Sequence, residues 1–276
     1  MSATFLLSAF GDEIDDELTI QLDVLASEGI TALELRNAWG VNVLDLSSEQ
    51  LQRVRELLRE RGFHISAIGS PIGKSSLSEP RAFEQERLER ALSAAERLDT
   101  RLIRIFSFYV QPENLDEGRS EVIERLGLLV KRAEQAGVTL LHENERGIYG
   151  ESATRCHDLL TTINSPALRL AFDPANFVQA GVCPMEEAWP LLKDFVTHVH
   201  IKDAVFHDGS VRPAGQGDGA IPELLAALNA RDYTGYLTLE PHLSMAGPAG
   251  GYSGEVGMRT AIRALNSLLA RLPTHQ

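Results

Sequence analysis

Short apolar runs alternate with longer amphipathic stretches along the whole chain. Eight of these runs are rich in β-branched and other apolar residues, and each is short enough to be a buried strand rather than a helix. The predicted strands, numbered one to eight in chain order, are Thr4–Phe10, Thr31–Arg36, Phe63–Gly69, Arg101–Ser107, Val138–Asn144, Leu168–Pro174, Val196–Lys202 and Tyr236–Pro241.

The stretches between the strands carry apolar residues at helical spacing, which predicts a helix after most strands. Such faces are formed by Ile14, Leu18, Leu22 and Leu25, by Leu51, Val54, Leu57 and Leu58, and by Val122, Leu126, Leu129 and Ala133. Ser47 to Gln50 has the pattern of a capping box at the start of the second of these helices. Gly29, Gly62 and Gly137 are placed to end three helices just before the next strand.

The alternation of strands and helices predicts a closed barrel. Strands separated by a full helix cannot pair as hairpins, so they lie parallel with right-handed crossovers. Eight βα units in roughly 250 residues match a (β/α)₈ TIM barrel. An open doubly wound sheet usually has a glycine-rich turn after its first strand, and Phe10–Glu13 offers none. No linker divides residues 1–276, so we predict one α/β domain.

Charge and composition narrow the classes of partner. The net charge is −13, which opposes binding to nucleic acid or to an anionic membrane, since both need clustered Lys and Arg. No apolar run approaches the ~18 residues that a membrane span needs. The N-terminal residues lack a basic segment of the signal-peptide type. Cys156 and Cys183 have no metal-ligand spacing and suit a reducing compartment. We therefore expect a cytoplasmic protein that acts on a small molecule.

Ionisable residues gather at the ends of predicted strands five to eight. These ends carry Glu143, Asp173, His200 and Glu240. Active sites of such barrels lie at the C-terminal ends of the strands, so the four side chains are expected to converge. Three converging carboxylates repel one another, and a divalent cation would remove that repulsion. Three oxygen ligands and one imidazole suit a single Mn²⁺, with Co²⁺, Mg²⁺ and Zn²⁺ as alternatives.

Five motifs resemble those of a known group of barrels. They are His142-Glu143-Asn144, Phe172-Asp173-Pro174-Ala175-Asn176, His198-Val199-His200-Ile201-Lys202-Asp203, Gly215-Gln216-Gly217-Asp218 and Gly235-Tyr236-Leu237-Thr238-Leu239-Glu240. With the alternating strands and helices, they make nearly the whole chain similar to the xylose isomerase-like TIM barrel superfamily, in particular the sugar phosphate isomerase/epimerase family.

The resemblance implies a chemistry for the metal site. It implies that Glu143 and Glu240 are catalytic as well as metal ligands, one removing a proton next to a polarised carbonyl and the other returning it. It implies an isomerase or epimerase of a ketose, keto-sugar or sugar phosphate, with a small carbohydrate or keto-polyol as partner. Homo-oligomers are common among such relatives, but the sequence specifies no interface.

Lys202 is a candidate for substrate binding. It lies on the same face of its predicted strand as His200, at the end where the metal ligands gather. There it would hold a substrate carboxylate, phosphate or ketone oxygen, or else pair with Glu143, Glu240 or Asp203.

Two further residues are candidates for substrate contact. Asn176 stands where family epimerases commonly carry a histidine; its amide can bond to a substrate hydroxyl but cannot act as a base. Glu34, near the end of the second strand, would contact substrate hydroxyls or form an internal ion pair with Arg36 or Arg104. His198 lies one layer deeper than the site and is expected to be a hydrogen-bonded core histidine.

Three other functions remain open at this stage. A dehydratase of a keto-cyclitol or a dehydroshikimate-like substrate would use the same glutamate for proton removal and then expel a β-hydroxyl. Phosphodiester cleavage, as in endonuclease IV relatives, needs additional histidines and is opposed by Asn176 and by the net charge of −13. A non-catalytic sugar-binding barrel is opposed by the presence of all four ligand types.

Overall fold

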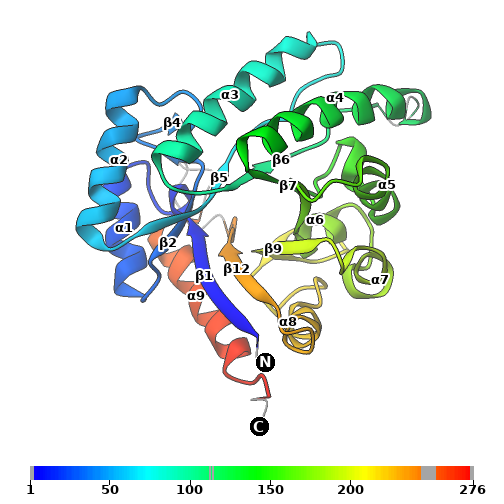
Figure 1. The fold of residues 1–276 in the computed structure, drawn as a ribbon. Coiled ribbons are helices and arrows are strands. Elements are labelled where there is room, and N and C mark those ends of the chain that lie inside the picture. The colour runs from blue at the N-terminus through cyan, green and yellow to red at the C-terminus, as the bar shows by residue number, and fades with distance from the viewer. Residues whose placement is uncertain (1–2, 112, 114, 244–252, 274–276) are drawn as a thin grey trace.

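A computed structural model describes residues 3–111, 113, 115–243 and 253–273 (Figure 1). Eight parallel strands form a closed barrel in the order β1, β12, β9, β8, β7, β6, β5 and β2. These strands are β1 (Thr4–Phe10), β2 (Ala32–Leu35), β5 (His64–Gly69), β6 (Leu102–Ile105), β7 (Thr139–Glu143), β8 (Leu168–Phe172), β9 (Val196–Ile201) and β12 (Thr234–Leu239). The predicted (β/α)₈ barrel is confirmed.

Most strand boundaries differ from the predicted ones by one or two residues, and hydrogen bonding explains two of these differences. Strand β12 begins at Thr234, earlier than its apolar run, because Thr234 pairs with Thr4 where β1 and β12 close the barrel. Strand β6 ends at Ile105, because the next residue, Phe106, donates its backbone N–H to the carbonyl of Ile72 in a loop. The apolar pattern thus marks burial, whereas the partner strand sets where pairing begins and ends.

Helices surround the barrel. They are α1 (Leu18–Ser27), α2 (Ser48–Arg61), α3 (Arg81–Arg97), α4 (Leu115–Ala136), α5 (Ala153–Ile163), α6 (Pro174–Gln179), α7 (Trp189–Leu192), α8 (Ile221–Asn229) and α9 (Gly254–Leu269). The capping box of α2 is confirmed between Ser47 and Gln50. Helix α1 begins at Leu18, not at Ile14, because Gly11–Glu13 form a 3₁₀ turn, η1, directly after β1.

Short elements complete the connections. They are the hairpin of β3 (Asn37–Ala38) with β4 (Val41–Asn42), the hairpin of β10 (Asp203–Ala204) with β11 (Val211–Arg212), the 3₁₀ turn η3 (Tyr149–Glu151) and the π-helical turn η4 (Pro184–Ala188). Both hairpins follow the carboxyl ends of barrel strands. They therefore belong to the end of the barrel called the mouth below.

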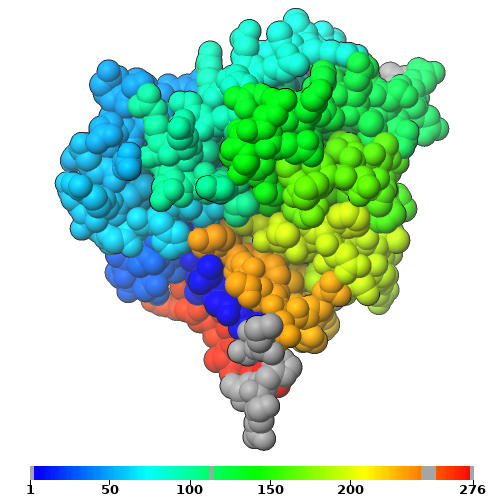
Figure 2. Space-filling model, viewed as in Figure 1, coloured from blue at the N-terminus to red at the C-terminus, as the bar shows by residue number. Residues whose placement is uncertain are grey.

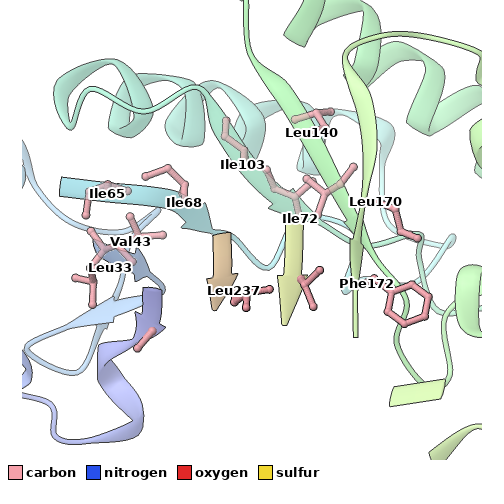
Figure 3. Packing of buried hydrophobic residues seen from close by; sticks show 14 of the residues in the cluster. Leu33, Val43, Ile65, Ile68, Ile72, Ile103, Leu140, Leu170, Phe172 and Leu237 are labelled. Carbon is pink, nitrogen blue, oxygen red and sulfur yellow. The ribbon is translucent and has the colours of Figure 1, made fainter. Parts of the chain in front are cut away.

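The main hydrophobic core lies between the strands and the helices. Figure 3 shows part of it, with Ile68 from β5, Ile103 from β6 and Leu140 from β7. Helices α3 and α4 pack side by side over this layer (Figure 2). Two residues of a smaller cluster, Leu141 and Ala171, face the inside of the barrel, because strand residues alternate between the two faces. None of the helices in the described ranges combines the length and apolar character that a bilayer crossing requires.

Candidate metal and active site

The structure brings the four predicted metal ligands together at the mouth. Glu143 is the last residue of β7, Asp173 and Glu240 directly follow β8 and β12, and His200 lies near the end of β9. One ligand atom from each residue lies within 4.8 Å of those from the other three, and all four residues are buried. Neighbouring strand ends therefore converge as the barrel geometry requires.

The backbone around Asp173 is held by an asparagine from the adjacent strand. Asn144 donates its side-chain Nδ2 to the carbonyl of Asp173 (2.8 Å), and its Oδ1 accepts from the backbone N–H of Asp173 (2.9 Å). Asp173 also caps α6, where its Oδ1 accepts from the N–H of Asn176 at 2.9 Å. Its second oxygen, Oδ2, lies 2.9 Å from Nζ of Lys202. The capping bond orients this carboxylate toward the site.

Glu143 has an arginine and an amide as partners. Nη1 of Arg104 donates to its Oε2 at 2.7 Å, and Nδ2 of Asn176 donates to its Oε1 at 3.0 Å. Nδ1 of His200 lies 3.2 Å from the same Oε1. Burial alone would raise the pKa of Glu143, but the charges of His200 and Arg104 outweigh burial and lower it to about 2. Glu143 is therefore a fixed carboxylate.

Glu240 has two cations as partners. Nη1 of Arg36 donates to its Oε1 at 2.8 Å, and Nζ of Lys202 donates to its Oε2 at 3.1 Å. Arg36 also bonds to Asp12 (2.7 Å) and Glu13 (3.2 Å) of turn η1. Burial opposes ionisation of Glu240, but Lys202, a nearby histidine and Arg36 hold its pKa well below the ordinary value. The two glutamates thus each have an arginine of their own.

Asp173 shows that negative charge is crowded in this site. Its pKa is raised to about 6, first by burial and then by the charges of Glu143 and Glu240, while Lys202 opposes the shift. A group in this position binds a proton easily. A bound cation would also reduce the repulsion among the carboxylates, and Asp173 would then stay ionised and able to act as a ligand.

The residues fit a divalent metal ion. Ligand oxygens and nitrogens lie about 2.0–2.2 Å from ions such as Zn²⁺, so ligands on opposite sides of one ion are up to about 4.4 Å apart. The four ligand atoms lie within 4.8 Å of one another, which is close to that span. Three carboxylates and an imidazole are also a suitable donor set for such an ion. When bound, the ion would be held by Glu143, Asp173, His200 and Glu240.

The three predicted substrate-binding residues are buried beside these ligands. Lys202 pairs with Asp173 and Glu240 and is 6% exposed. Asn176, 2% exposed, donates to Glu143. Glu34 is fully buried, and its Oε2 lies 2.8 Å from Nε2 of a histidine in β9. Lys202 and Asn176 therefore border the two glutamates, whereas Glu34 engages a histidine beneath them.

Four charged residues of the site were not predicted to act there: the sequence offered Arg36 and Arg104 only as ion-pair partners of Glu34, and it gave no role to Asp12 or Glu13. Arg104 contacts a predicted ligand directly, and Asp12 and Glu13 act through Arg36. Arg104 interrupts the buried run Leu102–Ile105, and a charge inside a buried strand is a signal that was present in the sequence. Asp12 and Glu13 directly follow the first strand, so their position at a strand end was a weaker signal of the same kind.

The glycine-rich segment after β9 serves a structural purpose. Asp203 accepts hydrogen bonds from the backbone N–H groups of Gly215, Gly217 and Gly219 at 2.8–3.0 Å. A Cβ atom at Gly217 or Gly219 would lie 2.4 or 2.6 Å from Oδ1 of Asp203, which only glycine avoids. The segment thus binds a side chain of this same chain, which explains its glycines.

Comparison with known proteins agrees with this geometry. A family model described as xylose isomerase-like TIM barrel matches residues 22–274. The chain belongs to this family. The resemblance inferred from the five sequence motifs is therefore confirmed.

The proteins similar to this chain include two that are named as epimerases and one named as a dehydratase. The 2-epi-5-epi-valiolone 7-phosphate 2-epimerase of Actinoplanes sp. is 25% identical over 217 residues, covering 74% of this chain and 78% of the relative. D-psicose 3-epimerase from Clostridium cellulolyticum, solved with D-tagatose, has a TM-score of 0.75 at 17% identity and covers 99% of this chain and 100% of its own. A probable 3-DHS dehydratase from Bacillus anthracis has a TM-score of 0.73 at 16% identity, with coverages of 96% and 99%. At these identities the two structural likenesses show the fold alone.

Proposed function

We propose that this protein is a divalent-metal-dependent isomerase or epimerase of a ketose, keto-sugar or sugar phosphate. One observation carries the proposal: two buried glutamates, Glu143 and Glu240, converge on one point from strands three positions apart in the barrel. The epimerase from Actinoplanes that matches 74% of this chain supports the same class of reaction.

The chain's own residues supply the proton transfers. When bound, the cation supplies positive charge where negative charge develops as a carbon-bound proton leaves. Glu143 or Glu240 accepts that proton on a carboxylate oxygen, and Arg104 and Arg36 keep the two carboxylates ionised and fixed in position. Both glutamates are buried, so solvent screens their interactions with the two arginines less than it would at the surface.

The position to which the proton returns decides the product. When the second glutamate takes a proton from solvent and delivers it to the same carbon from the opposite face, that centre is inverted. When the first glutamate gives its proton to the neighbouring carbon, an aldose is exchanged with a ketose. Lys202 borders Glu240 and Asn176 borders Glu143. We assign both to the binding of substrate oxygens next to the reacting carbon.

Dehydration is the second candidate function, and Asn176 favours it. The residue stands where family epimerases commonly carry a histidine, and its amide cannot transfer a proton. In a dehydratase the first glutamate removes a proton next to a carbonyl, as above. The same glutamate, now protonated, then gives this proton to the departing β-hydroxyl, which leaves as water, and the glutamate is a carboxylate again.

Solvent deuterium incorporation tests the proposed function. The protein, loaded with Mn²⁺, is incubated in D₂O with ketoses, ketose phosphates, keto-glycosides and keto-cyclitols, and exchange and products are followed by NMR. We expect metal-dependent exchange that Glu143→Gln abolishes, with products that separate an epimer, an isomer and an enone.

A matched control distinguishes a catalytic role from general damage. Glu84 is also a buried glutamate, bonded to Ser75 and Arg87 on the outside of the barrel. Glu84→Gln should leave exchange unchanged. Exchange that survives in Glu143→Gln, or that continues after the metal has been removed by a chelator, would contradict the proposal.

A further inference from the structure

A fully buried carboxylate lies beneath the metal-ligand histidine. His198 and His200 project from the same face of β9, with their ring centres 5.4 Å apart and the rings nearly perpendicular. Oε2 of Glu34 lies 2.8 Å from Nε2 of His198 and 3.3 Å from Nε2 of His200. All three residues are 0% exposed. A substrate at the mouth would therefore meet His200 before it reached Glu34.

The barrel brings these residues together from distant strands. Glu34 lies on β2, three positions from β9 in the closed sheet, so its side chain crosses the inside of the barrel. Thr197 is an extra residue on β9, since Val196 pairs with Leu170 and His198 with the next residue of β8. This bulge sets the register in which the two histidines fill the interior.

The hydrogen bond to Glu34 assigns different roles to the two ring nitrogens of His200. One oxygen of Glu34, Oε2, lies within hydrogen-bond distance of a ring nitrogen of each histidine, an arrangement in which a carboxylate accepts from two imidazole N–H groups. Nε2 of His200 must then carry a proton. The other nitrogen, Nδ1, lies 3.2 Å from Oε1 of Glu143 and 3.8 Å from Oε2 of Glu240, among the other ligand atoms.

We propose that Glu34 is a positioning residue that commits Nε2 of His200 to a hydrogen bond and thereby makes Nδ1 the metal ligand. The inference rests on the proposed function, because it presupposes the metal site. It replaces direct substrate contact as the role of Glu34. Carboxylates that orient a ligand histidine in this way tune metal affinity about 10–100-fold.

His198 in turn holds Glu34. Its Nε2 bonds to the same carboxylate oxygen and lies 2.9 Å from Oγ1 of Thr238 on β12. The carboxylate is therefore fixed between two rings rather than resting on His200 alone. Thr238, His198, Glu34 and His200 form one connected series of contacts that ends at the metal site.

Metal affinity and the protonation of the ring nitrogens test this inference without any substrate. In Glu34→Gln the amide can also donate a hydrogen bond, so Nε2 of His200 need not keep its proton. We expect Mn²⁺ to bind about 10–100-fold more weakly to Glu34→Gln by titration calorimetry. Glu84→Gln should bind Mn²⁺ as tightly as the unaltered protein.

Long-range ¹H–¹⁵N NMR of the histidine rings identifies the nitrogens directly. His200→Gln assigns the His200 signals by their loss. In the unaltered protein we expect Nε2–H without metal and Zn²⁺ on Nδ1 when this diamagnetic ion is added. Zn²⁺ on Nε2, or a folded Glu34→Gln with unchanged Mn²⁺ affinity, would overturn the inference. If the protein acts on no sugar, the proposed function fails, but these two measurements still decide the role of Glu34.

Discussion

The two ends of the barrel are built from the same eight strands but differ in the kind of side chain that they bring together. The mouth holds a dense group of charged residues, all buried except the partly exposed Arg36, namely Asp12, Glu13, Glu34, Arg36, Arg104, Glu143, Asp173, His200, Lys202 and Glu240. At the opposite end, Leu6 pairs with Tyr236 and is 43% exposed, and the Tyr236 hydroxyl has a hydrogen bond to the exposed His64 (3.0 Å).

The comparison indicates which charged residues are needed for the fold and which are needed for the site. Desolvation of buried ions costs free energy that pairing only partly returns, so replacement of such pairs by apolar residues is often neutral or stabilising. At the end opposite the mouth, the pairing of Leu6 with Tyr236 closes the barrel between β1 and β12 without an ion pair. The charges at the mouth are therefore best explained by the chemistry proposed for it.

The largest effect is expected when a carboxylate at the mouth loses its charge. Glu240→Gln keeps the shape of the side chain but removes a proton acceptor. We expect the rate of solvent deuterium exchange into substrate to fall about 10²–10⁴-fold. A rate within threefold of that of the unaltered protein would mean that Glu240 transfers no proton.

A second large effect is expected when one partner of a buried ion pair is removed. Lys202→Met leaves Asp173 and Glu240 without the ammonium that each contacts. We expect the metal-free protein to lose about 3–5 kcal/mol in the free energy of unfolding, measured with urea. Added Mn²⁺ should restore part of this loss, because it supplies positive charge to the same oxygens. Equal stability with and without Lys202 would show that the pair is not desolvated as the structure indicates.

The smallest effect is expected at the opposite end of the same strands. Tyr236→Phe removes only the hydrogen bond to His64. We expect a loss of about 0.5–1.5 kcal/mol in the free energy of unfolding, with Mn²⁺ affinity and deuterium exchange unchanged. A large loss of metal binding in this variant would show that the two ends are coupled, and the comparison between them would fail.

The fold and the convergence of four side chains followed from local patterns. Apolar runs separated by helices determine a parallel barrel, and a barrel brings strand ends together, so the proximity of Glu143, Asp173, His200 and Glu240 was predictable. The ion pair proposed between Lys202 and Glu240 was also among the stated alternatives. Each of these inferences needs only the order of the strands and the alternation of their residues.

The partners that cross the barrel were not predictable in the same way. Glu34 meets His198 and His200 because their strands lie three positions apart and because β9 carries an extra residue at Thr197. A bulge shifts which side chains face each other, and the pattern of one strand does not reveal it. The separate pairing of Arg36 with Glu240 likewise depends on distances across the mouth rather than along the chain.

The hydrogen bonds of Asp203 have a consequence for the exchange of amide hydrogens. Loops at the rim of a barrel usually exchange their amide hydrogens quickly, since their N–H groups face water. Here the N–H groups of Gly215, Gly217 and Gly219 are bound to the buried carboxylate of Asp203, two residues after the end of β9. These amides should take up deuterium as slowly as those of β9. The amide hydrogens of this loop, which has no regular secondary structure, would then be protected from exchange to the same degree as those of the barrel sheet.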